Sequence, residues 1–83
     1  MIMKLKKDTQ PDQNIVFWDS KKEQGVLDYY MPENTLGFVI DQGKTDGKRH
    51  ISFFFLDEDM QEKSIEFFGW KSFNECVEPI TNN

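Results

Sequence analysis

The sequence contains few of the residues that build covalent or metal-bound sites. It has one cysteine, Cys76, and one histidine, His50, among 83 residues. A single cysteine cannot form a disulfide within the chain, and one cysteine with one histidine cannot supply the four ligands of a structural zinc site. Nothing in the sequence around Cys76 indicates an activated thiolate, so we expect a small buried side chain there. We therefore predict no metal site and no cofactor.

Long apolar runs are also missing. No run is longer than the four residues of 53–56, far below the roughly 18 residues that a membrane-spanning helix needs. Residues 1–4 lack the apolar segment of a signal peptide. We therefore expect a cytoplasmic protein with no membrane partner.

Positive charge is scarce, because 10 lysines and arginines stand against 15 aspartates and glutamates, for a net charge of -5. This balance argues against binding duplex nucleic acid through phosphate neutralisation alone, but it does not exclude recognition by stacking. A chain of 83 residues fits a single small domain, whose function lies on its surface rather than in a deep cleft. No motif pairs His50 with a nucleophile or an acid, so we predict no catalytic residues and no enzyme.

Short apolar segments separated by turn residues predict an all-β fold. We expect residues 1–24 to form an N-terminal arm with a short strand at 15–18, and residues 25–80 to form the folded domain. The expected strands of that domain cover residues 26–30, 36–40, 50–56, 64–68 and 75–80, with a polar loop at 41–49 and a turn-rich segment at 69–74. No amphipathic helix exceeds a turn or two. A barrel is the expected architecture, because closure removes the exposed edges of so small a sheet.

Residues 50–56 carry aromatic side chains on both faces of the expected strand. By alternation Phe53 points inward with Ile51, while Phe54 belongs to the other face. One of the two faces must therefore contact something other than water. The remaining positions that we assign to the core are Leu27, Val39, Ile65, Phe67 and Val77, and we expect Trp18 and Trp70 to be structural anchors.

Residues 25–40, GVLDYYMPENTLGFVI, resemble the opening segment GxVKWFNxxKGFGFI of the cold-shock domain family. The spacing from Gly25 through Tyr29 to Gly37 matches without a gap. Residues 50–55 are similar to the family's DVFVHF segment, and residues 64–67 and 75–77 to its fourth and closing strands. The resemblance covers about 55 residues of the chain. It implies a small five-stranded antiparallel OB-like barrel over residues 25–80, with the N-terminal segment as an extension.

The resemblance also implies a surface that binds single-stranded RNA or DNA by stacking unpaired bases, each worth roughly 1 to 3 kcal/mol. The positions that correspond to the family's stacking groups are Tyr29, Tyr30, Phe38, Phe54 and Phe55. Lys48 and Arg49, in the polar loop, are the basic side chains that we add to this nucleic-acid-binding set. Several family positions have lost a lysine or a ring, and these are Asp28, Asn34, Leu36 and Ser52. Such changes weaken the expected attraction for phosphate.

Two functions stay open. The first is non-enzymatic binding of single-stranded RNA or DNA by an RNA chaperone or regulator. The alternative is an acidic adaptor or inhibitor on an OB- or SH3-like barrel that docks a basic protein partner and does not bind nucleic acid. Asp28, Ser52 and the net charge favour the alternative, and self-association through the aromatic face is a variant of it, since the sequence leaves the oligomeric state open. A single exposed face shared by Tyr29, Tyr30, Phe38 and Phe54 would favour the first.

Overall fold

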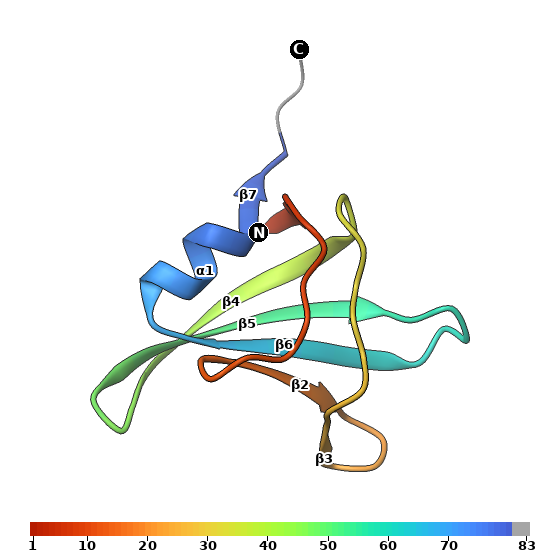
Figure 1. Cartoon of the computed structure of the whole chain (residues 1–83), viewed down its shortest axis with the longest axis horizontal. Helices are drawn as coiled ribbons and strands as arrows, with labels where there is room; N and C mark the ends of the chain where they lie inside the picture. The colour runs from red at the N-terminus through yellow and green to blue at the C-terminus, as the bar shows by residue number, and fades with distance from the viewer. Residues whose placement is uncertain (81–83) are drawn as a thin grey trace.

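The computed structural model describes residues 1–80, and its strands belong to one antiparallel sheet with a short helix packed on one side (Figure 1). The described residues form these elements in chain order: β1 (Ile2–Leu5), β2 (Ile15–Asp19), β3 (Gln24–Val26), β4 (Leu36–Thr45), β5 (Lys48–Leu56), β6 (Glu62–Phe68), α1 (Trp70–Cys76) and β7 (Val77–Pro79). The predicted all-β character is therefore confirmed.

The sheet is open rather than closed. Its strand order is β3-β2-β6-β5-β4-β1-β7, and within residues 1–80 the two end strands do not pair with each other. The predicted five-stranded OB-like barrel is therefore wrong. The N-terminal residues supply β1, which lies between β4 and β7 and widens the sheet instead of closing it. Each edge strand has only three residues, which limits the unpaired backbone at the edges.

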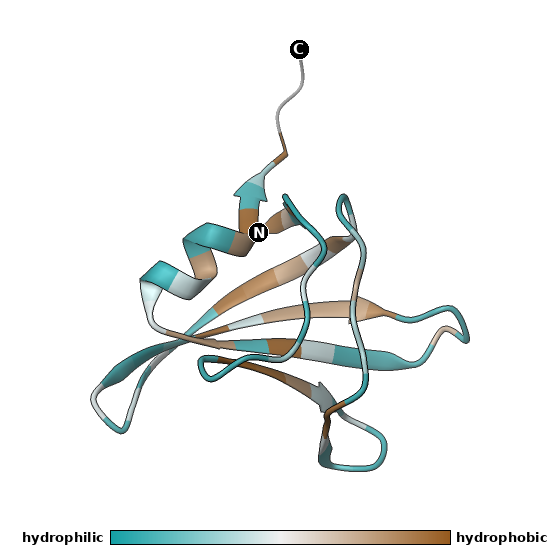
Figure 2. Ribbon diagram, viewed as in Figure 1, coloured by the Kyte–Doolittle hydropathy of each residue, from teal (hydrophilic) through white to brown (hydrophobic). Residues whose placement is uncertain are grey.

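One face of the sheet, which we call the inner face, carries the core together with α1. Ile51 and Phe53 of β5 are buried there, as predicted, and their antiparallel partners Phe67 and Ile65 are buried beside them. Phe73 of α1 packs edge-on against Phe67, with ring centroids 5.6 Å apart. In Figure 2 brown predominates along β2, β4 and β5, β6 is teal with a brown segment, and the turns between the strands are mostly teal. Val77 and Cys76 are also buried, so both predictions for them are confirmed.

Residues 1–24 do not form an arm. Met3 and Leu5 of β1 alternate into the core, and the β1 backbone pairs with β4 on one side and β7 on the other. The strand expected at 15–18 is present as β2, where Ile15 and Phe17 point inward. β1 has only four residues, and an alternation over so few positions does not identify a strand in the sequence. Its strand character depends on pairing with partners far along the chain.

The strand expected at residues 26–30 is not formed over that range, and it does not pair with residues 36–40. Only Gln24–Val26 is a strand, and it pairs with β2. Leu27, assigned to the core, is 84% exposed, so that prediction is wrong. The following residues form a loop that is held by backbone hydrogen bonds between Thr9 and Met31 in both directions and by contact of Tyr29 with Phe17. Tertiary contacts have replaced the strand pairing that the alternation predicted.

β4 and β5 form a long hairpin where a nine-residue loop was expected. The pairing runs up to Thr45 and Lys48, and the turn between them consists of Asp46 and Gly47, which both have positive φ. Two such residues in succession are typical of a type I′ turn, whose twist matches that of the strands. Lys48 and Arg49 therefore belong to a strand and not to a loop.

The chain after β6 differs from the prediction as well. The segment expected to be turn-rich forms α1, which begins after Gly69, a residue with φ of 105°. The expected last strand at 75–80 is reduced to β7. No helix of the described residues is long and apolar enough to cross a membrane.

Candidate docking surface

The face of the sheet opposite to α1, which we call the outer face, carries a row of large apolar side chains. Antiparallel partners point to the same side of a sheet, so the register defines the row directly. Across β1, β4, β5, β6 and β2 the partners are Ile2, Phe38, Phe54, Ser64 and Trp18. Four of these five side chains are apolar, and they come from strands far apart in the sequence.

Further apolar side chains flank this row on the same face. Leu36 and Leu56 lie on one side of it, and Ile40 and Val16 on the other. Leu36 is 59% exposed and Phe38 is 50% exposed, and Ile2, Leu56, Ile40, Val16 and Trp18 are exposed as well. Exposed apolar side chains gathered in this way on one face of a small domain mark an interaction surface.

A small polar network occupies the middle of the outer face. The Glu66 carboxylate accepts a hydrogen bond from the Ser52 hydroxyl and lies 2.6 Å from Nε2 of His50. Gln42 Nε2 donates to Ser52 at 3.2 Å, and the His50 ring stacks on Phe68 with centroids 4.8 Å apart. In this network Glu66 separates the imidazole from the hydroxyl, and Ser52 is 1% exposed. The arrangement orients side chains and offers no accessible nucleophile.

The predicted stacking rings are dispersed by the structure. Phe38 and Phe54 face each other across β4 and β5 on the outer face, as a shared platform requires. Phe55 lies in the core with 4% exposure, so its prediction as a surface ring is wrong. Alternation already places Phe55 on the side of Phe53, and it packs between that ring and Phe17 at centroid distances of 6.4 and 6.5 Å.

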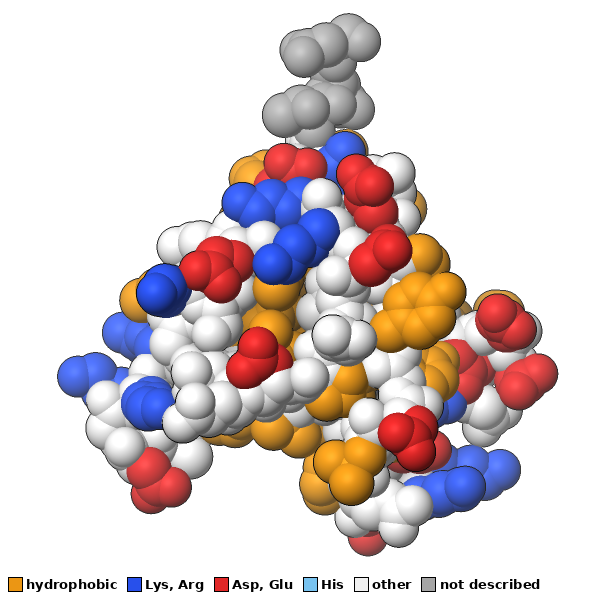
Figure 3. Space-filling model, in the orientation of Figure 1, with side chains coloured by type: hydrophobic (Ala, Val, Ile, Leu, Met, Phe, Trp, Pro, Cys, Tyr) orange, Lys and Arg blue, Asp and Glu red, His pale blue; other side chains and the backbone are white. Residues whose placement is uncertain are grey.

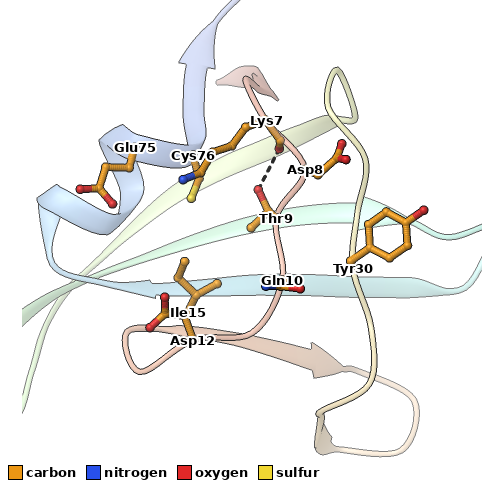
Figure 4. A pocket seen from close by; sticks show the side chains of 9 residues that line it. All are labelled: Lys7, Asp8, Thr9, Gln10, Asp12, Ile15, Tyr30, Glu75 and Cys76. Atoms are coloured by element: carbon orange, nitrogen blue, oxygen red, sulfur yellow. Dashed lines mark hydrogen bonds between the residues drawn. The ribbon is translucent and has the colours of Figure 1, made fainter.

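Tyr29 and Tyr30 lie away from the outer face. Tyr29 packs on Phe17 at the inner side, with the Lys63 ammonium 5.4 Å above its ring, and burial raises the pKa of its hydroxyl. Tyr30 is exposed and borders a cavity of about 400 Å³ near α1 (Figure 4). In that view its ring is directed away from Thr9 and Cys76. The four rings therefore do not share one face.

The two basic residues of the predicted set point to opposite faces. Lys48 is on the outer side, where its ammonium donates to Asn14 Oδ1 at 3.0 Å. Arg49 is on the inner side, where its guanidinium lies 5.9 Å from the Trp70 ring centroid and 3.4 Å from Asp41. Arg49 is thus engaged within the chain and does not contribute to a surface shared with Phe38.

The cavity of Figure 4 lies between the N-terminal segment and α1. Lys7, Asp8, Asp12 and Glu75 line it with the Thr9 and Cys76 side chains. The Thr9 hydroxyl donates to the Lys7 carbonyl, and burial raises the pKa of the Cys76 thiol. Within residues 1–80 every buried side-chain nitrogen or oxygen atom has a hydrogen-bond partner.

An acidic groove of about 810 Å³ lies beside the β5–β6 turn and the loop that carries Tyr29. Its Asp57 carboxylate is bonded to the Lys63 ammonium and to the backbone amide of Gln61, which together hold the pKa of Asp57 below its ordinary value of 3.8. The same bond raises the pKa of Lys63. Both side chains are nearly covered, with 7% and 12% exposure, so this pair fixes the turn. Among the described residues no cluster of three or more metal-ligating side chains occurs.

Comparison of the chain with protein-family models, curated proteins and solved structures gives no match. The sequence pattern indicates Phe38 and Phe54 but not Ile2 and Leu56, and it gives Leu36 only as a position where the family has a ring. The signal was present, since Leu36, Phe38 and Ile40 alternate with residues of the other face along β4. Only the register shows that five strands bring their apolar residues to one surface.

Proposed function

We propose that this chain is a non-enzymatic protein-binding module that docks a protein partner on the outer face of its open sheet. The observation that carries the proposal is the apolar row from Ile2 to Trp18, which is open to solvent on the side away from the core. Covering such a patch contributes about 25 cal/mol for each Å² of apolar surface removed from water.

Docking on the face fits this sheet better than docking on an edge. Partners that add a strand need a long unpaired edge, and here the edge strands β3 and β7 have three residues each. Pro79 also removes one backbone donor from β7. The outer face, by contrast, presents side chains from five strands.

A protein partner fits the chemistry of the outer face better than a nucleic acid does. The rings of Phe38 and Phe54 lie on paired strands. The side chains around them are aliphatic, namely Ile2, Leu36, Ile40 and Leu56. Such side chains complement the apolar core of a protein interface but offer no flat ring to a base. The net charge of -5 repels phosphate.

Site-specific photo-crosslinking in cells tests the proposal. A benzophenone amino acid replaces Leu36 or Leu56 on the outer face, and the matched control replaces Leu27, which is more exposed but lies in the loop. We expect protein adducts that resist nuclease from the two outer-face positions and a much weaker yield from position 27. Equal yields from all three positions, no adducts at all, or adducts that nuclease removes would each overturn the proposal.

Binding of single-stranded nucleic acid is a second candidate, supported by the direct pairing of Phe38 with Phe54 on the exposed face and by Lys48 on the same side. Titration with oligothymidine at low salt, followed by intrinsic fluorescence, tests it. Phe38→Ala is then expected to weaken binding by about 1 to 3 kcal/mol. No binding by the folded wild-type protein removes this candidate.

A further inference from the structure

We propose that the partner on the outer face is a second copy of this chain, packed face to face about a two-fold axis that lies in the interface and runs perpendicular to β5. This inference rests on the proposed function and specifies its partner. In such a pair the β5 strands of the two copies cross in nearly opposite directions, and two single-layer sheets become the two layers of a β-sandwich.

The charges at the two ends of β5 are complementary under this rotation. Lys48 begins β5, and the β5–β6 turn that follows its end carries Glu58 and Asp59 beside Asp57, whose carboxylate is already bonded to Lys63. In Figure 1 the β4–β5 hairpin and this turn project at opposite ends of the sheet. Figure 3 views the molecule from the side of α1, and it shows blue side chains toward the hairpin end, beside an acidic group at its tip, and red ones at the turn. The lysines of the β2–β3 turn also lie at the acidic end, but over other strands.

The distances along β5 match as well. Lys48 lies five residues before Phe53, about 17 Å along β5 at roughly 3.4 Å per residue, and the acidic turn starts at Asp57, four residues or about 14 Å beyond Phe53. A two-fold axis at the level of Phe53 therefore brings Lys48 of each copy over the acidic turn of the other. Within residues 1–80 no carboxylate pairs with Lys48, whose ammonium binds the neutral Asn14 side chain, so its charge remains available.

The same axis brings the apolar rows together. Along the strand direction, Phe38 of one copy lies at the same height as Ile40 of the other, and Trp18 lies at the same height as Val16. Five strands at about 4.8 Å spacing and three rows at about 7 Å give a footprint of roughly 500 Å² per copy, or about 1,000 Å² in total. That total reaches the lower limit of the area that specific interfaces bury. The uneven surface of the side chains and the two charged ends add to this area.

The polar network in the middle of the face is prepared for burial. A carboxylate that loses water is costly unless hydrogen bonds replace it, and Glu66 already has Ser52 and His50 as partners. At the level of Phe53 the axis places Glu66 over Ser64 of the other copy rather than over a second Glu66. The interface therefore brings no two carboxylates of this network into opposition.

Sedimentation equilibrium of the purified full chain tests the inference. We expect a dimer of twice 9.9 kDa in the absence of nucleic acid. Phe38→Asp is expected to weaken the dimer by about tenfold or more, and the matched control Leu27→Asp to leave it intact. Circular dichroism checks folding, and Leu56→Ser replaces Phe38→Asp if that variant does not fold.

Charge reversal tests the orientation of the two copies. Lys48→Glu is expected to weaken the dimer, and adding Glu58→Lys to restore it, because the reversed pair is again complementary. Lys71→Glu, on α1 and away from the outer face, has the same net charge as Lys48→Glu and is expected to leave the dimer intact.

The possible results separate this inference from the proposed function. A monomer at 100 µM, a dimer that forms only with an oligonucleotide, a dimer that Phe38→Asp leaves unchanged, or no rescue by Glu58→Lys each overturns the inference. Nuclease-resistant crosslinks from position 36 to a different protein would then preserve the proposed function with another partner. Loss of both the dimer and the crosslinks overturns both.

Discussion

Replacing Gly37 by alanine tests the packing that lies directly under the outer face. A Cβ atom at Gly37 would be 2.4 Å from Cε1 and Cζ of the Phe53 ring, and 2.8 Å from Cδ1. Carbon atoms pack best at about 3.5 to 4.0 Å, so the ring must move by about 1 Å or more. Phe53 has 0% exposure and packs against Phe55, which leaves it little room.

The expected loss of stability follows from two opposing effects. Overpacking a buried ring costs about 1 to 3 kcal/mol. The alanine also restricts the unfolded chain, which returns about 0.4 to 1 kcal/mol, since φ at Gly37 is not positive and alanine adopts it without backbone strain. The free energy of unfolding is therefore expected to fall by about 1 to 2 kcal/mol, and the urea midpoint by about 1 to 2 M at an m-value near 1 kcal/mol/M.

Urea unfolding followed by the fluorescence of Trp18 and Trp70 measures this change. Gly25→Ala is the matched control, because a Cβ there would meet only the Phe17 carbonyl oxygen at an ordinary 3.7 Å. We expect the control to stay within about 0.5 kcal/mol of wild type. Combining Gly37→Ala with Phe53→Leu should cost less than the sum of the single changes. Equal stability of the two alanine variants, or strict additivity, would refute the argument.

Two further predictions concern one core ring and one ion pair. Phe55→Ala is expected to lower the free energy of unfolding by about 3 to 5 kcal/mol because the ring is buried, whereas Phe38→Ala on the outer face lowers it by about 1 kcal/mol or less. Similar urea midpoints for both variants would contradict the assignment of faces. Asp57→Asn removes a carboxylate whose pKa Lys63 lowers, so we expect the wild type to be more stable to unfolding than the variant above about pH 4. This difference in stability fades as the pH falls through the lowered pKa. A difference that is the same at pH 7 and pH 3 would exclude the ion pair as its source.

Local pattern was sufficient for much of the inner face. The alternation over residues 50–56 predicted that Ile51 and Phe53 point inward, and the structure confirms both. The same alternation places Phe55 on the side of Phe53, and the resemblance to the cold-shock domain family led to its assignment as a surface ring. The period of two residues was the better guide, because side-chain direction in a strand is fixed by the local backbone.

Strand partners required the tertiary structure. Residues 26–30 alternate like a strand, yet contacts with Thr9 and Phe17 hold Met31 and Tyr29 in a loop. β1 was not expected as a strand, although it pairs on both sides. Pairing is decided by residues distant in the chain, and a short segment carries little information about them.

The all-β character, several of the strands and the inward direction of residues such as Ile65 and Phe67 can be predicted from the residue pattern alone. The open sheet, and the meeting of Ile2, Phe38 and Trp18 on one exposed face, are seen only in the folded chain. Alternation sets which side of its own strand a residue occupies, while register and strand order set which residues become neighbours across strands.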